Sequence, residues 1–219
     1  MQPLDEKAIA FIVDAVKPFT MVCEDGVRFT IQQTERVLLE GIPGHLIECG
    51  TWRGGCAFAM LFTQLAVIGS IVKRVYLFDS FQGLPVADSR DGQAAREWQG
   101  QTKHNCKASR WELENQMRAF GFNTGWSIYE GWFSNTLPTF GSPAIALLRL
   151  DSDWYESTKL CLEKFYPRVE ERGTVIIDDY YAWEGCARAL HEFLAANDLP
   201  HRIRALKDHS AAYFIKDIR

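Results

Sequence analysis

The pattern of apolar and polar positions changes character partway along the chain. In the first part, apolar residues recur at helical spacing, as do Ile9, Ile12 and Val16. Further on, short apolar runs alternate with segments of helical period. The change predicts an N-terminal helical segment over residues 1–44, followed by one larger domain over residues 45–219.

The second part predicts strands and helices in turn. Residues 144–150 form the clearest buried strand, an apolar run interrupted only by Arg149. The last two strands are joined by Lys-Asp-His-Ser, which is too short for a crossover, so they must be antiparallel. The expected strands are residues 45–49, 74–78, 126–129, 144–150, 174–177, 202–206 and 211–215, and the expected helices are residues 5–17, 30–40, 55–68, 110–120, 155–169 and 183–196.

Strands that alternate with helices predict a parallel sheet with helices on both faces. With the C-terminal hairpin added, the expected fold class is α/β, a Rossmann-like fold of the class I methyltransferase type with a mostly parallel seven-stranded sheet. Flavodoxin-like folds lack that hairpin. Residues 86–109 are polar and without a clear period, and we expect them to form a lid loop.

Composition and charge narrow the setting. Hydrophobic residues make up 47% and charged residues 24%, which is typical of a globular rather than a disordered chain. With a net charge of -4, the chain lacks the excess of positive charge that nucleic-acid-binding domains carry, so we expect no nucleic acid as a partner. We expect no membrane span or signal peptide, and none of the six cysteines forms a CxxC pair. A cytoplasmic location is expected, and apolar residues in the N-terminal helices leave a homo-oligomer open.

The loop after the first expected strand suits a cofactor without phosphates. Gly50 and Gly54 are separated by three residues, and Trp52 stands where a GxGxxG fingerprint has its middle glycine. A bulky residue there hinders a pyrophosphate but tolerates S-adenosylmethionine. Glu48 would suit the ammonium group of that cofactor. Asp79, one βα unit downstream, would accept hydrogen bonds from two ribose hydroxyls. The alternative is that the glycines only make a tight turn into a helix.

Two pairs of acidic residues follow neighbouring strands. Asp151 and Asp153 follow one strand, and Asp178 and Asp179 follow the next. Ligands of open α/β sheets bind beyond the carboxyl ends of the strands, and four carboxylates that close repel one another unless a cation lies between them. Carboxylate oxygens suit Mg²⁺ or Mn²⁺. Alternatively, each pair supplies a helix cap, which explains one residue of a pair but not both.

Five blocks of residues occur in a characteristic order. They are Glu-Cys-Gly-Thr-Trp-Arg-Gly-Gly at 48–55, Asp-Ser-Phe-Gln-Gly-Leu-Pro at 79–85, Gly-Trp-Phe at 131–133, Leu-Asp-Ser-Asp-Trp-Tyr-Glu-Ser-Thr at 150–158 and Ile-Asp-Asp-Tyr at 177–180. Together they resemble the macrocin O-methyltransferase (TylF-type) family, which methylates sugar hydroxyls of natural products such as macrolides and aminocoumarins. The resemblance runs from about residue 19 to about residue 195. The chain departs from longer members in its short N-terminal segment and at residues 86–109.

The resemblance implies a role for each block and a small-molecule acceptor that contains a sugar. Asp151, Asp178 and Asp179 would hold magnesium, and Asp153 would be the general base. For Arg53, a salt bridge with a nearby acid is an equal alternative to a cofactor contact. The expected cofactor-binding residues are Glu48, Gly50, Thr51, Arg53, Gly54, Gly55, Asp79, Ser80, Gly131, Trp132, Phe133 and Asp151.

Three other functions stay open at this point. The acceptor could be a small phenol or catechol, because such enzymes also use metal carboxylates after these two strands. A glycosyltransferase would use residues 151–153 as a DxD metal site but would leave Glu48 and Asp79 unexplained. A non-catalytic protein would bind the cofactor without turnover, which the retained acidic set argues against.

Overall fold

The computed structural model describes residues 2–103 and 105–217. Within this part of the chain, one seven-stranded sheet has the order β3-β2-β1-β4-β5-β7-β6. The strands from β3 to β5 are parallel, whereas β7 is antiparallel to both β5 and β6, which confirms the predicted fold class. The strands are β1 (His45–Cys49), β2 (Val75–Asp79), β3 (Trp126–Glu130), β4 (Ile145–Leu150), β5 (Val169–Ile177), β6 (Arg204–Ala205) and β7 (Ala212–Ile215).

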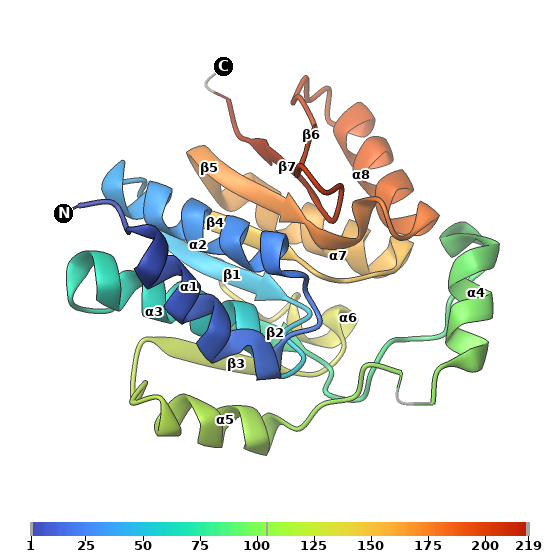
Figure 1. Ribbon diagram of the computed structural model, residues 1–219. Helices are drawn as coiled ribbons and strands as arrows, with labels where there is room; N and C mark the ends of the chain where they lie inside the picture. Colours follow the sequence, from blue (N-terminus) through green and yellow to red (C-terminus); the bar gives the residue numbers. More distant parts are fainter. Residues whose placement is uncertain (1, 104, 218–219) are drawn as a thin grey trace.

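Helices cover both faces of this sheet (Figure 1). The longer helices are α1 (Glu6–Val16), α2 (Glu24–Leu39), α3 (Gly55–Ile68), α4 (Gly92–Gln101), α5 (Arg110–Ala119), α7 (Tyr155–Phe165) and α8 (Glu184–Ala196). The short ones are α6 (Phe133–Thr136), η1 (Lys17–Phe19), η2 (Ser89–Asp91), η3 (Tyr166–Arg168) and η4 (Asp178–Tyr180). Residues of α1, α2, α3 and α5 pack in one core cluster, and residues of α7 and α8 in the other.

Alternate residues of each central strand enter opposite core clusters. In β4, Leu147 packs with the α1 to α3 side and Leu148 with the α7 and α8 side, and Leu77 and Phe78 of β2 divide in the same way. Side chains of a strand point to opposite faces in turn, so a strand covered on both faces is apolar throughout. Burying each such side chain stabilises the fold by about 1.5–3 kcal/mol.

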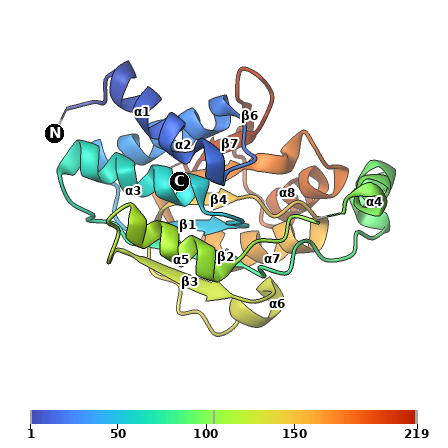
Figure 2. The ribbon, with the colours of Figure 1, turned by 60° about the horizontal axis from the view of Figure 1, so that its bottom comes forward.

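The segment 86–109 is partly helical, which corrects the prediction of a loop. It contains η2 and α4, while residue 104 lies outside the described residues. Ala95 is the one buried residue of α4, so the sequence carries no apolar stripe that would reveal the helix. Helix α4 lies beside α8 at one end of the molecule, away from the sheet (Figures 1 and 2).

Two helix boundaries also differ from those predicted. Helix α2 begins at Glu24 rather than residue 30, because the thiol of Cys23 caps it. The helix predicted over residues 155–169 ends at Phe165, and β5 begins at Val169 rather than residue 174. A cysteine thiol that caps a helix leaves little trace in the hydrophobic periodicity. The same holds for a helix that continues through a 3₁₀ turn directly into a strand. No helix in the described ranges is long and apolar enough to cross a membrane.

The strand order places a binding crevice beside β1. Strand β1 lies between β2 and β4: the chain continues from β1 to β2 and β3 on one side and then crosses to β4 on the other side. At such a switch point the loops beyond the carboxyl ends of the strands separate and leave room for a ligand. The candidate site is therefore expected where β1, β2, β4 and β5 end.

Candidate active site

A cavity of about 650 Å³ lies at the carboxyl ends of these four strands. Volumes of this size hold small molecules and cofactors. Most of the sequence-predicted site residues line it, whereas Arg53 and Gly54 do not. Those that line it are Glu48, Gly50, Thr51, Gly55, Asp79, Ser80, Gly131, Trp132, Phe133, Asp151, Asp153, Asp178 and Asp179.

Arg53 and Gly54 contribute to packing outside this cavity. The Arg53 guanidinium lies over the rings of Phe19 and Trp52, 5.7 and 5.4 Å from their centroids. No salt bridge of Arg53 is found among the described residues, and its contact with the cofactor stays a prediction. Gly54 has a φ of +93°, and a Cβ there would meet Phe58 at 3.0 Å. Gly54 therefore starts α3 in a conformation that favours glycine.

The loop after β1 is held by Asp79 at the end of β2. One carboxylate oxygen of Asp79 accepts hydrogen bonds from the backbone N–H groups of Thr51 and Trp52, at 2.8 and 2.7 Å. Gly50 has a φ of +82°, and a Cβ there would lie 1.6 Å from the carbonyl oxygen of Asp151. Only glycine allows the ends of β1 and β4 to approach this closely. The glycines are thus required by the turn, as the alternative interpretation held, and the turn also lines the cavity.

Glu48, at the cavity end of β1, is a buried acid with an unused oxygen. The residue is 2% exposed, and its Oε2 has no hydrogen-bond partner among the described residues. Burial raises the pKa of Glu48 to about 8, although the positive charge of Arg149 opposes the shift. A buried carboxylate oxygen without a partner is costly, which indicates that a ligand satisfies it.

Arg149 is the structural centre of the acidic site, and the sequence analysis assigned it no role. Its guanidinium is fully buried and lies 3.5 Å from Glu48, 2.9 Å from Asp151 and 2.8 Å from Asp178. Buried charges are paired, so the single arginine within an apolar strand was a usable signal for acids nearby.

Three carboxylates of the two acidic pairs point at a common position. Ligand atoms of Asp151, Asp153 and Asp179 lie within 4.8 Å of one another, whereas Oδ1 of Asp178 accepts hydrogen bonds from Arg149 at 2.8 and 2.9 Å. Asp178 as a metal ligand stays a prediction. Burial, followed by repulsion from Asp151, raises the pKa of Asp153 to about 8. Burial and neighbouring carboxylates also raise the pKa values of Asp151 and Asp179.

The alternative that these acids are helix caps is wrong. Helix α7 has Trp154 at its N-cap and α8 has Trp183, and neither N-cap side chain makes a capping hydrogen bond. The backbone N–H of Tyr155, the first residue of α7, donates instead to Asp91 of η2 at 2.7 Å. The side chains of Asp151, Asp153 and Asp179 therefore do not serve as helix caps.

Asp153 is held in a fixed position within the cluster. Its backbone adopts a φ of +56°, and its N–H donates to Asp179 Oδ2 at 2.9 Å. The indole Nε1–H of Trp183 donates to Asp153 Oδ1 at 3.2 Å. A non-glycine residue at positive φ is rare and is often found at functional sites. The arrangement aims one carboxylate oxygen at a set position in the cavity.

Part of the cavity lining is aromatic. Trp98 of α4, Trp154 and Trp183 line the cavity together with Leu84 and Pro85. Trp98 and Asp91 come from the segment predicted to be a structureless lid, so sequence reasoning missed both. A tryptophan in a polar stretch was the available signal, because α4 buries little else.

This fold, with an acidic cavity beyond the ends of its parallel strands, is that of a class I methyltransferase. The chain belongs to the macrocin-O-methyltransferase (TylF) family, whose model matches residues 14–216. The family resemblance predicted from the five sequence blocks is confirmed.

Two relatives are O-methyltransferases by name, and the name of the first includes a rhamnosyl group. Over 170 residues, 73% of this chain and 61% of the relative, the sequence is 37% identical to the 8-demethyl-8-(2,3-dimethoxy-alpha-L-rhamnosyl)-tetracenomycin-C 4'-O-methyltransferase of Streptomyces olivaceus. Over 164 residues it is 32% identical to the mycinamicin III 3''-O-methyltransferase of Micromonospora griseorubida, with 73% of this chain and 63% of that protein covered. The chain thus spans about three fifths of the length of these relatives.

A solved structure agrees in fold. The O-methyltransferase NovP superposes with a TM-score of 0.83 at 30% sequence identity, covering 91% of this chain and 83% of that one. The family and these relatives are methyltransferases, which favours the methyltransferase hypothesis over the glycosyltransferase hypothesis.

Proposed function

We propose that this protein is an S-adenosylmethionine-dependent O-methyltransferase that uses Mg²⁺ and methylates a sugar hydroxyl of a glycosylated natural product. The proposal is supported by membership of the family and by the relatives that act on sugar-bearing compounds. The observation that carries it is one cavity that holds both an unsatisfied buried glutamate and a separate trio of convergent carboxylates.

The residues around Glu48 fit S-adenosylmethionine. Glu48 Oε2 would accept from the cofactor's ammonium group, and the Gly50 turn gives a close approach without a side chain. Asp79 already accepts three backbone N–H groups, from Thr51, Trp52 and Phe81. It therefore shapes the turn, and in this proposal it also binds the ribose of the cofactor.

The residues around Asp153 fit a small divalent cation. Asp151 and Asp179 would supply oxygen ligands from two adjacent strand ends, as Mg²⁺ prefers, with Asp153 beside them. Burial, and after it repulsion between the carboxylates, raises their pKa values. A bound cation would relieve that repulsion.

The chain's own residues would then orient the acceptor and remove its proton. S-adenosylmethionine would supply the methyl group, and Mg²⁺ would hold the acceptor oxygen and lower the pKa of its hydroxyl. Asp153 would accept the proton, with Trp183 holding its Oδ1 and Asp179 its backbone N–H. An ordinary aspartate, with a pKa near ~3.9, is a weak base for a free hydroxyl, so the transfer would depend on the lowered pKa of the hydroxyl at the metal site.

Removal of the metal should abolish turnover. We expect EDTA to stop the formation of S-adenosylhomocysteine and Mg²⁺ in excess to restore it, because Asp153 alone cannot deprotonate a sugar hydroxyl. Asp179→Asn should weaken Mg²⁺ binding in a titration, whereas Asp25→Asn, at an exposed position on α2, should not. Unchanged activity after thorough chelation would reject the metal's role.

Cofactor affinity should depend on pH through Glu48. The raised pKa means that Glu48 holds a proton below about pH 8 in the ligand-free protein. An ammonium ion favours the charged carboxylate, so binding must displace that proton. The affinity for S-adenosylhomocysteine should therefore rise with pH between ~6 and ~8, by up to about tenfold per pH unit. Calorimetry across this range measures it, and a Glu48→Gln variant with the same pH dependence would rule out Glu48 as its source.

A further inference from the structure

A short stretch of chain from Asp151 to Tyr155 joins the end of β4 to the start of α7 and contains Asp153. At its beginning, the backbone N–H of Asp151 donates to the carbonyl oxygen of Cys49 at 2.8 Å. In its middle, Asp153 has a φ of +56°, and its N–H donates to Asp179 at 2.9 Å. A non-glycine residue stays in such a conformation only where its surroundings fix it. The position of Asp153 therefore depends on the contacts that hold both ends of this stretch.

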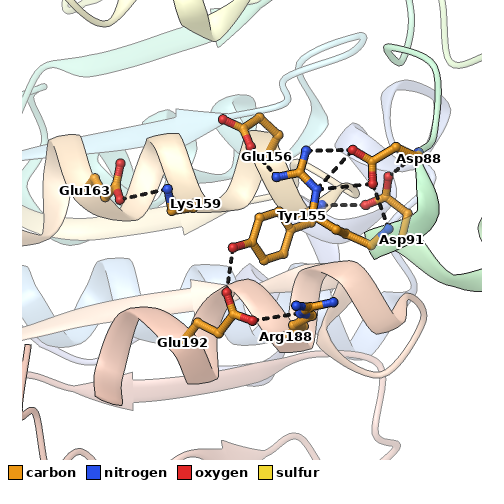
Figure 3. Close-up of polar contacts among 9 residues, drawn as sticks. Asp88, Asp91, Tyr155, Glu156, Lys159, Glu163, Arg188 and Glu192 are labelled. Carbon is orange, nitrogen blue, oxygen red and sulfur yellow. Dashed lines mark hydrogen bonds and ion pairs between the residues drawn. The ribbon is translucent and has the colours of Figure 1, made fainter. Parts of the chain in front are cut away.

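The second end of the stretch is held by Asp91 of η2, which is 64 positions away in the chain. The backbone N–H of Tyr155 donates to Asp91 Oδ1 at 2.7 Å (Figure 3). The other oxygen, Oδ2, accepts the N–H of Asp88 at 2.7 Å, and Asp91 is only 4% exposed. Buried N–H groups that lose their acceptor are costly, so two such groups hold this carboxyl group in one orientation.

Gly185 of α8 leaves the space that the carboxyl group occupies. A Cβ at position 185 would lie 2.4 Å from Asp91 Oδ1 and 3.1 Å from the backbone nitrogen of Tyr155. The φ of Gly185 is not in the left-handed region, so the helical backbone alone would accept alanine at this position. The glycine is therefore explained by its packing against Asp91. Elements η2, α7 and α8 meet at this one carboxyl group.

Helix α8 also carries the residue that holds the side chain of Asp153. Trp183 is the N-cap of α8, and its indole N–H donates to Asp153 Oδ1 at 3.2 Å. The ring centroids of Trp98 and Trp154 lie 5.6 and 5.3 Å from that of Trp183, and the three rings form a tryptophan wall in the cavity. Asp91 thus contacts both helices that fix Asp153, α7 at its first residue and α8 within its first turn.

We propose that Asp91 is a positioning residue for methyl transfer, because it fixes the starts of α7 and α8 and, through them, the place of the Asp153 carboxyl group. The proposal rests on the proposed function, in which Asp153 accepts the proton of the acceptor. Asp91 itself would take no proton. If Asp91 served the fold alone, its loss would lower stability and leave the rate of transfer in the folded protein unchanged.

Single-turnover kinetics of the intact chain test the proposal, with a 4-nitrophenyl 6-deoxyhexoside that the wild type methylates as the acceptor. We expect Asp91→Ala to lower the rate constant of transfer at least about tenfold, because a catalytic group loses rate steeply when it is misplaced. Asp91→Asn keeps one acceptor oxygen and should lose less. The affinity for S-adenosylhomocysteine should be unchanged in both variants.

A double variant distinguishes positioning from a separate effect on the rate. In the Asp153→Asn protein, the additional change Asp91→Ala should lower the rate constant no further, because a positioning residue acts only through the group that it positions. The same loss from Asp91→Ala in both backgrounds would overturn the proposal. A wild-type rate constant in the Asp91→Ala single variant would also overturn it.

Gly185→Ala tests the same contact without removing a hydrogen-bonding group. The added methyl group would displace Asp91 and the Tyr155 N–H, and we expect the rate constant to fall about tenfold. Gly100→Ala is the matched control, because Gly100 is also helical, on α4, and a Cβ there meets nothing within 4 Å. A Gly185→Ala protein as fast as the Gly100→Ala protein would contradict the proposal.

A spectroscopic measurement needs no acceptor. The indole N–H of Trp183 donates to Asp153 and therefore reports on its position. In NMR spectra of the isotope-labelled protein with S-adenosylhomocysteine, this resonance is identified by its loss in Trp183→Phe. Its exchange with solvent should be several-fold faster in Asp91→Ala and unchanged in Gly100→Ala. Unchanged exchange in Asp91→Ala would overturn the proposal. Failure of the proposed function is recognised separately, by a wild-type rate in Asp153→Asn or by absent S-adenosylhomocysteine binding.

Discussion

Asp153→Asn is expected to lower kcat by about 10²–10⁴-fold, the usual contribution of a general base. The variant keeps the size of the side chain and its contact with Trp183, but its amide cannot accept the proton of the acceptor. Binding of S-adenosylhomocysteine should be unchanged, because Glu48 and the Gly50 turn lie on β1 and the loop that follows it. Single-turnover measurements with a glycoside acceptor separate the chemical step from binding.

Trp183→Phe is the companion variant for this experiment. It retains an aromatic ring beside the cavity and removes only the N–H that holds Asp153 Oδ1. A partial loss of kcat with a shifted pH profile would identify Trp183 as a positioning residue. If Asp153→Asn turned over at the wild-type rate, Asp153 would have no part in the chemistry.

Arg149→Met is expected to give the largest loss of stability, about 3–5 kcal/mol in the free energy of unfolding near pH 8. The methionine fills a similar volume but leaves Glu48, Asp151 and Asp178 without their buried cation. The loss should shrink toward pH 5, because burial raises the pKa values of Glu48 and Asp151, which can then take up protons instead of repelling each other. Denaturant unfolding at the two pH values measures both effects.

Arg118→Met provides the control for this substitution. Arg118 is half-exposed on α5 and lies 3.8 Å from Glu114. Exposed pairs contribute little, so this variant should unfold like the wild type. An Arg149→Met protein as stable as the Arg118→Met protein would show that the buried guanidinium is not what holds the acidic residues together.

Much of the fold could be predicted because its strands are buried on both faces. The run from Ile145 to Leu150 could only be a strand in a covered sheet, and the short turn before β7 fixed an antiparallel hairpin. Helix α4 could not be predicted, because it packs on its neighbours through Ala95 and Trp98 rather than through an apolar stripe. The hydrophobic pattern of a sequence reflects which side chains are buried, so a helix that buries few side chains is hard to predict.

The part of the candidate site that lies at the ends of the strands could be predicted from the sequence. Asp79 ends β2, Asp151 directly follows β4 and Asp179 is the second residue after β5, and the structure brings all three to one cavity. The partners of Arg149, the contact of Asp91 with the first amide of α7 and the tryptophan wall depend on side chains that meet only in the folded chain. These contacts join residues up to 101 positions apart, from Glu48 to Arg149, and no spacing rule in the sequence encodes them.

The most direct test of the central claim is calorimetric titration of the purified protein with S-adenosylhomocysteine, with and without Mg²⁺. We expect one site per chain with an affinity on the order of micromolar, about -8 kcal/mol, and a marked loss of that affinity in Glu48→Gln. Absence of binding in both conditions would contradict the assignment of this cavity to S-adenosylmethionine and, with it, the proposed methyltransferase activity.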